Sequence, residues 1–341
     1  MNIGVLGAGS WAIALSVLLH KKGHRVCMWE YDSGAAEFLQ KRRELPSKLP
    51  GVTIPQEVEI VNDIAAAVNM AQLVLCVVPS QTMRSTMQSV AKLVKPQALD
   101  KIEGWVIASK GIESGTLKLM TDVVADEIPG LGLNRIAALS GPSHAEEVSK
   151  EIPTSVVAAS ESHQLALLVQ EQFSTMTFRI YTNDDMRGVE LAASIKNVIA
   201  LAAGICDGMG FGDNTKGALM TRGIAEMMRL GRSMGARDAT FSGLAGIGDL
   251  ITTCISKHSR NRQMGELIAQ GCTLDQALER MTMVAEGVQT ARSAYELSKK
   301  MNIDMPITME VYKVLFENKP AQEAVRDLMM RESKSELWGL A

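Results

Sequence analysis

The sequence predicts an α/β protein: a doubly wound, mostly parallel sheet in the N-terminal part, followed by an all-α C-terminal part. Three observations support this. Short apolar segments alternate with helical ones through the first half, a glycine-rich turn joins the first strand to the first helix, and helical patterns alone follow residue 183. A length of 341 residues is typical of two domains, which we place at 1–182 and 183–341.

The alternating elements can be placed along the chain. Buried strands are predicted at residues 3–6, 26–29, 73–78, 105–109 and 136–140. Helical spacing appears between strands at residues 11–22 and 82–94, and later at residues 186–203, 216–234, 274–281, 288–299 and 308–316. Asn183, Asp184 and Asp185 form a candidate N-cap cluster for the first of the later helices.

Composition narrows the class of protein. Lys and Arg number 35 against 38 Asp and Glu, a net charge of −3, so neither a nucleic-acid partner nor an acidic disordered tail is expected. The five cysteines are odd in number and contain no C-x-x-C pair, so we predict a reducing cytoplasmic location, no disulfide framework, no metal site and no catalytic cysteine.

Neither a leader nor a membrane span is expected. The first six residues lack a basic region and run directly into a glycine turn. The longest apolar stretch, residues 191–206, carries Lys196 and Asn197 at its centre and is too short to cross a bilayer comfortably.

Gly7, Gly9 and Ala12 match the pattern G-x-G-x-x-G/A between the first strand and the first helix. The first glycine permits a tight turn, and the second lets backbone amides approach a pyrophosphate at the positive end of the helix. A glycine-rich strand-to-helix turn without a ligand is the alternative. Because the second strand ends in an acidic residue, we favour dinucleotide binding and a Rossmann-like sheet.

That acidic residue is Glu30, about twenty residues after the glycine motif. A carboxylate at this position accepts hydrogen bonds from the ribose hydroxyls of NAD and repels the additional phosphate of NADP. The alternative is a solvated loop residue. The sequence therefore predicts a preference for NAD(H).

Lys196 lies on an unusually apolar helical face. At helical spacing its neighbours are Ala192, Ala193, Ile199, Ala200 and Ala203. Such a lysine either extends past small neighbours to solvent or is buried for acid–base use, because burial lowers its pKa. Beside a dinucleotide-binding domain we favour the second interpretation, since one lysine can remove or deliver the proton that accompanies hydride transfer.

Other polar groups follow strands or begin helices. Lys110 and the segment Gly141 to His144 follow predicted strands, at the edge where doubly wound sheets bind ligands. His144 is read as an ordinary loop histidine. Asp249 follows two glycines at a helix start, where an acid is also an ordinary first-turn residue. Ser259, Arg260 and Asn261 suit either a phosphate site or a capped helix.

In this order the motifs resemble the NAD(P)-dependent glycerol-3-phosphate dehydrogenases of the bacterial type. The resemblance covers nearly the whole chain and rests on GAGSWAIALS at residue 7, VPSQ at 78, SKGIE at 109, SGPSHAEEV at 140, ELAASIKNVIALAAGICDGMGFGDNTKGALMTRG at 190, GLAGIGDLITTC at 243, SRNRQMG at 259 and VAEGVQT at 284. SKGIE and the long block at 190 are the specific ones.

The resemblance implies reversible reduction of dihydroxyacetone phosphate to sn-glycerol 3-phosphate for glycerophospholipid synthesis, by a homodimer. It implies that Lys196 accepts the proton during oxidation and that Lys110 contacts both substrate and cofactor. The implied substrate contacts are Gly141, Ser143, Asp249, Ser259, Arg260 and Asn261, with the last two on the phosphate. The implied cofactor contacts are Ser10, Trp11, Tyr31, Pro79, Ala145, Arg260, Val284 and Glu286.

One departure bears on the cofactor. The family commonly has Trp-Gly-His/Arg-Asp after the second strand, with a basic residue suited to the phosphate of NADP. This chain reads Trp29-Glu30-Tyr31-Asp32, which replaces the basic residue and adds a carboxylate. The departure favours NAD(H), while the family as a whole accommodates NADP(H).

Two alternatives differ in class from this reading. A related two-domain dehydrogenase of another hydroxy acid or sugar phosphate is disfavoured by the SKGIE and SRN segments. An inactive dinucleotide sensor is disfavoured by the presence of Lys110, Lys196 and Asp249 together.

Overall fold

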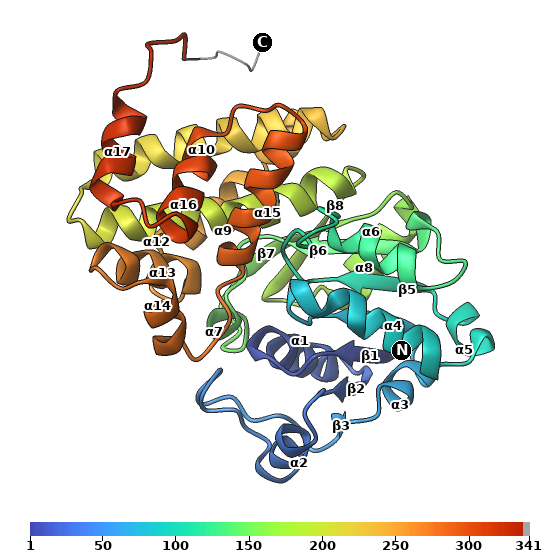
Figure 1. Cartoon of the computed structure of the whole chain (residues 1–341). Coiled ribbons are helices and arrows are strands. Elements are labelled where there is room, and N and C mark those ends of the chain that lie inside the picture. The colour runs from blue at the N-terminus through green and yellow to red at the C-terminus, as the bar shows by residue number, and fades with distance from the viewer. Residues whose placement is uncertain (337–341) are drawn as a thin grey trace. The chain divides into compact units, whose positions relative to one another are not determined.

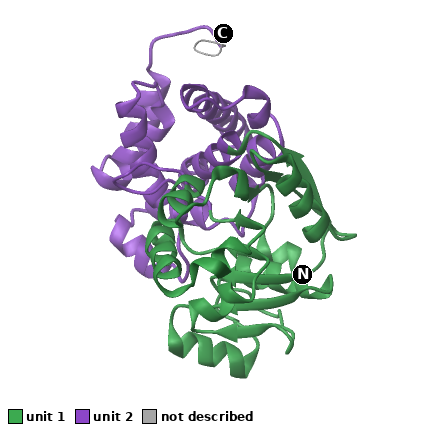
Figure 2. Cartoon of the chain, turned by 90° about the vertical axis from the view of Figure 1, so that its right-hand side faces the viewer, with its two compact units in different colours: residues 1–109, 120–186 green, residues 110–119, 187–341 purple. Residues whose placement is uncertain are grey.

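The computed structural model describes residues 1–336 and divides into two compact units (Figures 1 and 2). Unit 1 consists of Met1–Ser109 and Met120–Met186, and unit 2 of Lys110–Leu119 together with the chain from Arg187 onward. The predicted boundary after residue 182 and this division differ at two places. The last strand runs through residue 183, and the short segment 110–119 belongs with the helices.

Unit 1 contains one sheet of eight strands in the order β3-β2-β1-β4-β5-β6-β7-β8. The strands are β1 (Asn2–Leu6), β2 (Arg25–Trp29), β3 (Glu59–Val61), β4 (Leu73–Cys76), β5 (Gly104–Ile107), β6 (Ile136–Ser140), β7 (Thr154–Ala159) and β8 (Phe178–Asn183). All neighbouring pairs are parallel except β6 with β7. The prediction of a doubly wound, mostly parallel sheet is confirmed, and the five predicted strands are β1, β2, β4, β5 and β6.

Three strands were not predicted, each for a local reason. β3 has only three residues, too few to show a period. β7 is composed of Thr, Ser, Val and Ala, a mixture without a strong apolar signal. β8 lies at the edge of the sheet, where Phe178 and Ile180 are buried and Arg179 and Tyr181 are exposed. This alternation is typical of a half-buried edge strand rather than of the fully buried strands the prediction relied on.

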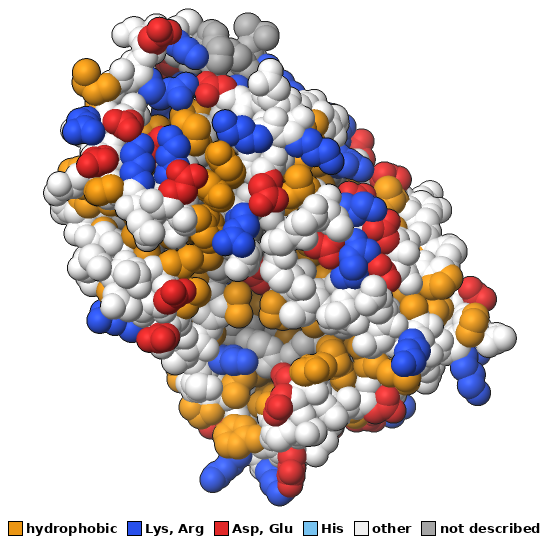
Figure 3. Space-filling view, in the orientation of Figure 1, with side chains coloured by type: hydrophobic (Ala, Val, Ile, Leu, Met, Phe, Trp, Pro, Cys, Tyr) orange, Lys and Arg blue, Asp and Glu red, His pale blue; other side chains and the backbone are white. Residues whose placement is uncertain are grey.

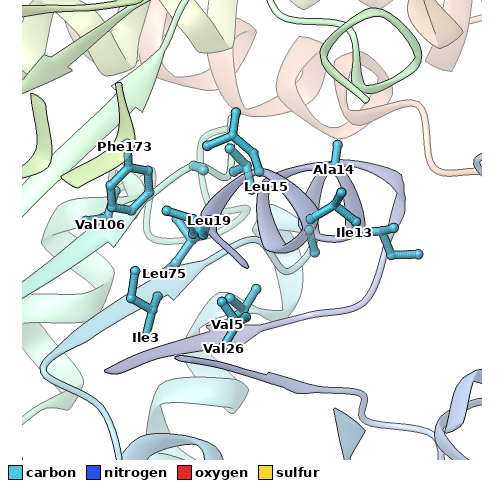
Figure 4. Close-up of a cluster of buried hydrophobic side chains, with 14 of the residues drawn as sticks. Ile3, Val5, Ile13, Ala14, Leu15, Leu19, Val26, Leu75, Val106 and Phe173 are labelled. Carbon is cyan, nitrogen blue, oxygen red and sulfur yellow. The ribbon is translucent and has the colours of Figure 1, made fainter. Parts of the chain in front are cut away.

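The helices of unit 1 connect these strands. They are α1 (Ser10–Lys21), α2 (Ser33–Arg42), α3 (Ile64–Asn69), η1 (Ser80–Thr82), α4 (Met83–Leu93), α5 (Pro96–Asp100), α6 (Met120–Glu127), η2 (Leu133–Arg135), α7 (Ala145–Val148) and α8 (His163–Phe173). Leu15 and Leu19 of α1 lie with Ile3 and Val5 of β1 in one fully buried cluster (Figure 4). This apolar contact fixes the first helix, and with it the glycine turn, on the sheet.

Unit 2 is helical after β8 through residue 336, as the sequence predicts. Its elements are α9 (Met186–Gly208), α10 (Asp213–Ser233), α11 (Asp238–Phe241), the π-helical turn η3 (Leu244–Gly248), α12 (Asp249–Ile255), α13 (Arg260–Ala269), α14 (Leu274–Arg280), α15 (Glu286–Lys300), α16 (Pro306–Phe316) and α17 (Ala321–Met329).

The central helix α9 is longer than its apolar sequence suggests. Its 23 residues would be long and apolar enough to cross a membrane, but 94% of the relevant window is buried inside the chain. A second candidate, the pair 238–255 and 260–269, is bent by 48°. Lys196 and Asn197, at the centre of the apolar stretch, are both buried within the helix packing. Burial of this kind is typical of a core helix.

Two glycines allow α13 to lie directly against α9. A Cβ atom on Gly204 would lie 1.9 Å from the carbonyl oxygen of Arg262, and one on Gly265 would lie 2.1 Å from that of Leu201. Any larger residue would therefore push the helices apart. The close crossing brings the start of α13 next to the middle of α9, where Lys196 lies.

A buried carboxylate that the sequence analysis missed joins α10 to α16. Glu226 accepts hydrogen bonds from the backbone N–H of Ile307 at 2.5 Å and from the N–H and hydroxyl of Thr308 at 3.1 and 3.0 Å. It satisfies the free N–H groups at the start of α16. Burial raises the pKa of this carboxyl to about 7, although the hydrogen bonds oppose the shift.

All five cysteines are free, and four are buried: Cys27, Cys76, Cys206 and Cys254. Burial raises the pKa of the Cys27 thiol to about 12 and that of Cys206 to about 11. These thiols stay protonated near neutral pH and are poor nucleophiles, in agreement with their reading as packing residues. On the face shown in Figure 3, acidic and basic side chains are interspersed, which matches the small net charge.

Candidate active site

The side chain of Lys196 ends inside unit 2 rather than in solvent. The residue is 6% exposed, and its Nζ donates to Oδ1 of Asp249 at 2.8 Å and to Oγ1 of Thr253 at 2.7 Å. Two polar partners in an apolar helix bundle fix the ammonium in one place. Of the two sequence interpretations, the geometry supports the buried lysine and contradicts the one that reaches solvent.

Asp249 connects Lys196 to a second lysine. While Oδ1 faces Lys196, its Oδ2 accepts from Nζ of Lys110 at 2.7 Å. Asp249 is 2% exposed and begins α12, directly after the π-helical turn η3. Gly246 makes that turn tight, since a Cβ there would lie 2.0 Å from the carbonyl oxygen of Phe241. Lysines from distant parts of the sequence thus share one buried carboxylate.

Burial and two neighbouring charges together set the pKa of Lys196. Burial lowers the pKa of its ammonium to about 8, the nearby Lys110 charge lowers it further, and Asp249 opposes the shift. Burial by itself would raise the pKa of Asp249, but the two lysines outweigh it and hold that pKa below its usual value. The Asp249 carboxyl is therefore ionised near neutral pH, and the Lys196 ammonium gives up its proton more easily than that of an exposed lysine.

Thr253 is a member of this cluster that sequence reasoning missed. Its hydroxyl donates to the backbone oxygen of Asp249 at 2.6 Å and accepts from Lys196. A threonine four residues after an aspartate shares its helix face, so the D-x-x-x-T spacing was the signal that could have found it.

The residue after Lys196 links α9 to two other helices. Oδ1 of Asn197 accepts from Nδ2 of Asn261 at 2.9 Å, and Oδ1 of Asn261 accepts from the N–H of Gly287 at 2.9 Å. Asn197 is 4% exposed and Asn261 8%. The amide of Asn261 therefore joins α9, α13 and the start of α15. Its predicted contact with a phosphate stays a prediction.

The other predicted phosphate ligands lie beside this link. Ser259 is the N-cap of α13 and accepts from the N–H of Arg262, so the capped-helix alternative describes its side chain. Arg260 is partly exposed and donates from Nη1 to the carbonyl oxygen of Val284 at 3.2 Å. Glu286 opens α15 two residues later. The structure thus brings Ser259, Arg260, Val284 and Glu286 together within unit 2.

The glycine turn of unit 1 has the geometry expected of a nucleotide loop. Gly7 has a φ of +115°, and a Cβ there would lie 3.0 Å from the carbonyl oxygen of Val77. Gly9 is the N-cap of α1 with an ordinary φ of −76°, and a Cβ on it would meet nothing within 4 Å. Neither backbone nor packing explains this second glycine. A glycine without such a reason is what close approach of the backbone to a pyrophosphate would require, and the following Ser10 and Ala12 are buried.

The turn follows β1, where the strand order of the sheet reverses: β2 and β3 lie on one side and β4 and β5 on the other. β1 has β2 on one side and β4 on the other, so Gly7, Glu30 and Pro79 follow the carboxyl ends of three adjacent parallel strands. Oε1 of Glu30 accepts from the N–H of Asp32 at 3.1 Å. Tyr31 is 82% exposed. A topological switch point of this kind is where doubly wound sheets bind nucleotides.

The remaining predicted contacts of unit 1 follow β6. Gly141 has a φ of +147°, and a Cβ there would lie 2.8 Å from Cα of Val156, so packing against β7 requires this glycine. Ser143 donates to the carbonyl oxygen of Gly141, and Ala145 opens α7. Trp11, which is in α1, packs against Phe178 of β8, with ring centroids 6.3 Å apart.

A buried lysine of lowered pKa is suited to moving the proton that accompanies hydride transfer, and the glycine turn of unit 1 has the pattern of a loop that binds a dinucleotide. Fold and sites together define a two-domain nicotinamide-dependent dehydrogenase. Two family models identify the kind of dehydrogenase. The model described as NAD-dependent glycerol-3-phosphate dehydrogenase N-terminus matches residues 2–166, and the model of the C-terminus of the same family matches residues 185–326. The chain belongs to the NAD-dependent glycerol-3-phosphate dehydrogenase family.

Individual relatives agree. The chain is 49% identical over 340 residues to the glycerol-3-phosphate dehydrogenase [NAD(P)+] of Chlorobium limicola, covering 99% of this chain and 100% of the relative. Identity to the Fusobacterium nucleatum enzyme of the same name is 46% over 337 residues, with 99% of each covered. The crystal structure of a glycerol-3-phosphate dehydrogenase from Coxiella burnetii has a TM-score of 0.91 at 35% identity and covers 97% of this chain and 99% of that one.

These comparisons confirm the resemblance drawn from the sequence and the class of enzyme, and they confirm use of NAD(P) at the level of the family. The preference for NAD(H) and the roles of individual residues stay predictions.

Proposed function

We propose that the chain interconverts dihydroxyacetone phosphate and sn-glycerol 3-phosphate, with Lys196 as the group that gives and takes the proton. The observation that carries this proposal is the buried Lys196 ammonium, bound to Asp249 and Thr253. The nicotinamide, when bound, supplies or accepts the hydride. The substrate oxygen that gains negative charge during ketone reduction receives its proton from Lys196, and the same amine takes that proton back in oxidation.

Each charged neighbour has a separate task in this proposal. Asp249 orients both lysines and balances part of their charge. Lys110 supplies a second positive charge, which stabilises the developing alkoxide and contacts cofactor and substrate. Arg260, with Ser259 and Asn261, binds the phosphate at the start of α13, where the helix dipole favours an anion.

The direct test is an assay of NADH and NADPH oxidation with dihydroxyacetone phosphate. We expect turnover with this substrate and little with hydroxy acids that lack a phosphate. A higher kcat/KM for another sugar phosphate or a hydroxy acid would favour the related dehydrogenase instead. Binding of NADH without turnover would favour the inactive sensor.

We further propose that residues 1–182 bind the cofactor and residues 183–341 the substrate, with Lys110 contributed by the segment that packs into unit 2. A cytoplasmic homodimer that supplies the glycerophospholipid backbone is supported by the family resemblance.

Glu30 determines the choice of cofactor in this account. A carboxylate after β2 accepts the ribose hydroxyls of NADH and repels the phosphate of NADPH, so kcat/KM should be higher with NADH by about 10-fold or more. Glu30→Gln should narrow that ratio, whereas Glu37→Gln, which removes an exposed carboxylate from α2, should not. Equal kcat/KM values for the two cofactors in the unsubstituted enzyme would contradict the role of Glu30.

Arg260 tests the phosphate site. Arg260→Ala removes a charge-assisted contact, so kcat/KM for dihydroxyacetone phosphate should fall by about 10- to 100-fold. With unphosphorylated dihydroxyacetone the loss should stay within about 3-fold. Arg280→Ala, at the exposed end of α14, is the matched control. Equal losses with both substrates would show that Arg260 does not bind the substrate phosphate.

A further inference from the structure

The segment Lys110–Leu119 lies between β5 and α6 of the sheet in sequence, yet it belongs to the helical unit (Figure 2). The chain leaves unit 1 after Ser109 and returns to it at Met120. Lys110 is the first residue after the crossing. The lysine that contacts Asp249 is therefore carried by a loop that belongs to unit 2, although the sequence on both sides of the loop belongs to unit 1.

Two apolar side chains anchor this loop. Ile112 is 0% exposed and Leu119 is 1% exposed, and the two residues form an antiparallel bridge. Between them, the N–H of Glu113 donates to the carbonyl oxygen of Lys118 at 2.9 Å, which closes the loop near its base. The ends of the loop are thus held together and buried at the same point.

The core that receives the anchors is the one that carries the catalytic cluster. Ile112 and Leu119 belong to the same group of buried residues as Ile195, next to Lys196, and Leu250, next to Asp249. Leu117 packs against this group as well. All three charged residues are thus tied to a single apolar core through a neighbour in the sequence.

Lys110 needs such support more than its partners do. Its side chain is 18% exposed, against 7% for Lys196 and 3% for Asp249. A lysine that is reached by solvent and has a flexible stem holds one position poorly unless its backbone is fixed. Ile112, two residues away, fixes that backbone. Ser114 adds a weaker contact with Ser293 of α15, with hydroxyl oxygens 3.4 Å apart.

We propose that Ile112 and Leu119 are positioning residues, which anchor the loop 110–119 in the helical core and so hold the Lys110 ammonium at Asp249. The inference rests on the proposed role of Lys110. The anchors keep this lysine with Asp249 and Lys196 inside unit 2. Neither anchor touches the reacting atoms, so each acts only through Lys110.

The test is a double-mutant cycle on the full-length enzyme. Ile112→Ala and Leu119→Ala should each lower kcat/KM by about 10- to 100-fold, because a small displacement of a positioned group is costly. In the background of Lys110→Met, the same substitutions should cost no more than about 2-fold, since the residue they position is gone. Leu315→Ala, a buried leucine of the same core in α16, is the control and should cost about 2-fold or less in both backgrounds.

A pH profile separates positioning from general loosening. The charge of Lys110 lowers the pKa of Lys196, so a displaced Lys110 should move the apparent pKa of the reaction upward in Ile112→Ala. Ile112→Val keeps most of the side chain and should restore both the rate and the profile. If Ile112→Ala does not fold, Leu119→Ala carries the same comparison.

The outcomes are distinct. Three results would each contradict the positioning role and leave the proposed function unaffected. They are losses that simply add to that of Lys110→Met, an unchanged pH profile in Ile112→Ala, and normal activity of Ile112→Ala where Lys110→Met is impaired. Full activity in Lys110→Met would overturn the role of Lys110, and the positioning role with it.

Discussion

Lys196→Met should lower kcat for dihydroxyacetone phosphate reduction by about 100-fold or more, the usual loss when a general acid–base group is removed. Methionine has a length similar to that of lysine and is apolar, so it can occupy the buried position that Lys196 has in α9. It cannot donate to Asp249 or to a substrate oxygen. The expected loss is therefore chemical rather than structural.

The control measurements isolate that cause. NADH affinity, followed by fluorescence, should stay almost unchanged, because the nucleotide loop lies in unit 1. Lys299→Met, an exposed lysine in the last turn of α15, should keep full turnover. Near-normal turnover in Lys196→Met would remove this residue from the reaction.

Asp249→Asn should have the second largest effect, a loss of about 100-fold in kcat near pH 8. The carboxylate accepts from two ammonium groups, and the neutral amide leaves them facing each other without compensation. Because Asp249 raises the pKa of Lys196 against the effect of burial, its removal should lower that pKa further. Ketone reduction requires the protonated amine, so its rate should begin to fall at a lower pH than in the unsubstituted enzyme.

Asp238→Asn provides the comparison, since Asp238 pairs with Arg232 at a partly exposed position of α11. It should leave the pH profile of reduction where it is. Thermal unfolding of both variants checks that each remains folded. If the alkaline limb of Asp249→Asn does not move, the carboxylate does not control the protonation of Lys196.

Much of the fold could be predicted because its central strands are continuous apolar segments. β1, β4 and β5 are buried along their whole length or nearly so, and such strands appear in sequence as uninterrupted apolar residues. The two edge strands lack this signal: β3 has only three residues, and in β8 buried and exposed residues alternate. Sequence patterns therefore predicted the centre of the sheet better than its edges.

The sequence marked individual candidate residues of the site, but it did not predict which of them are in contact. Lys196 could be recognised because an ammonium on a face of alanines is costly unless it is used or paired. Its pairing with Asp249, 53 residues away, and that of Asp249 with Lys110, 139 residues away, depend on tertiary packing. No local pattern encodes such distances.

Two residues show how tertiary contacts change a local interpretation. Asn261 stands in a motif that suits a phosphate, and its buried amide in addition joins Asn197 to Gly287, which no local pattern predicts. Ile112 is a single apolar residue in a loop without periodicity, so nothing local marks it as part of the helical core. Both roles become visible only when distant segments are brought together.

The central claim is that one buried amine, Lys196, carries the proton in both directions. It is tested most directly by the pH dependence of kcat measured for reduction and for oxidation on the same enzyme. With a pKa of about 8, the rate of reduction should be constant below that pH and fall above it, while the rate of oxidation should rise through the same pH and then level off. Profiles that are flat between about pH 6 and 10 in both directions, or that turn at unrelated pH values, would contradict it.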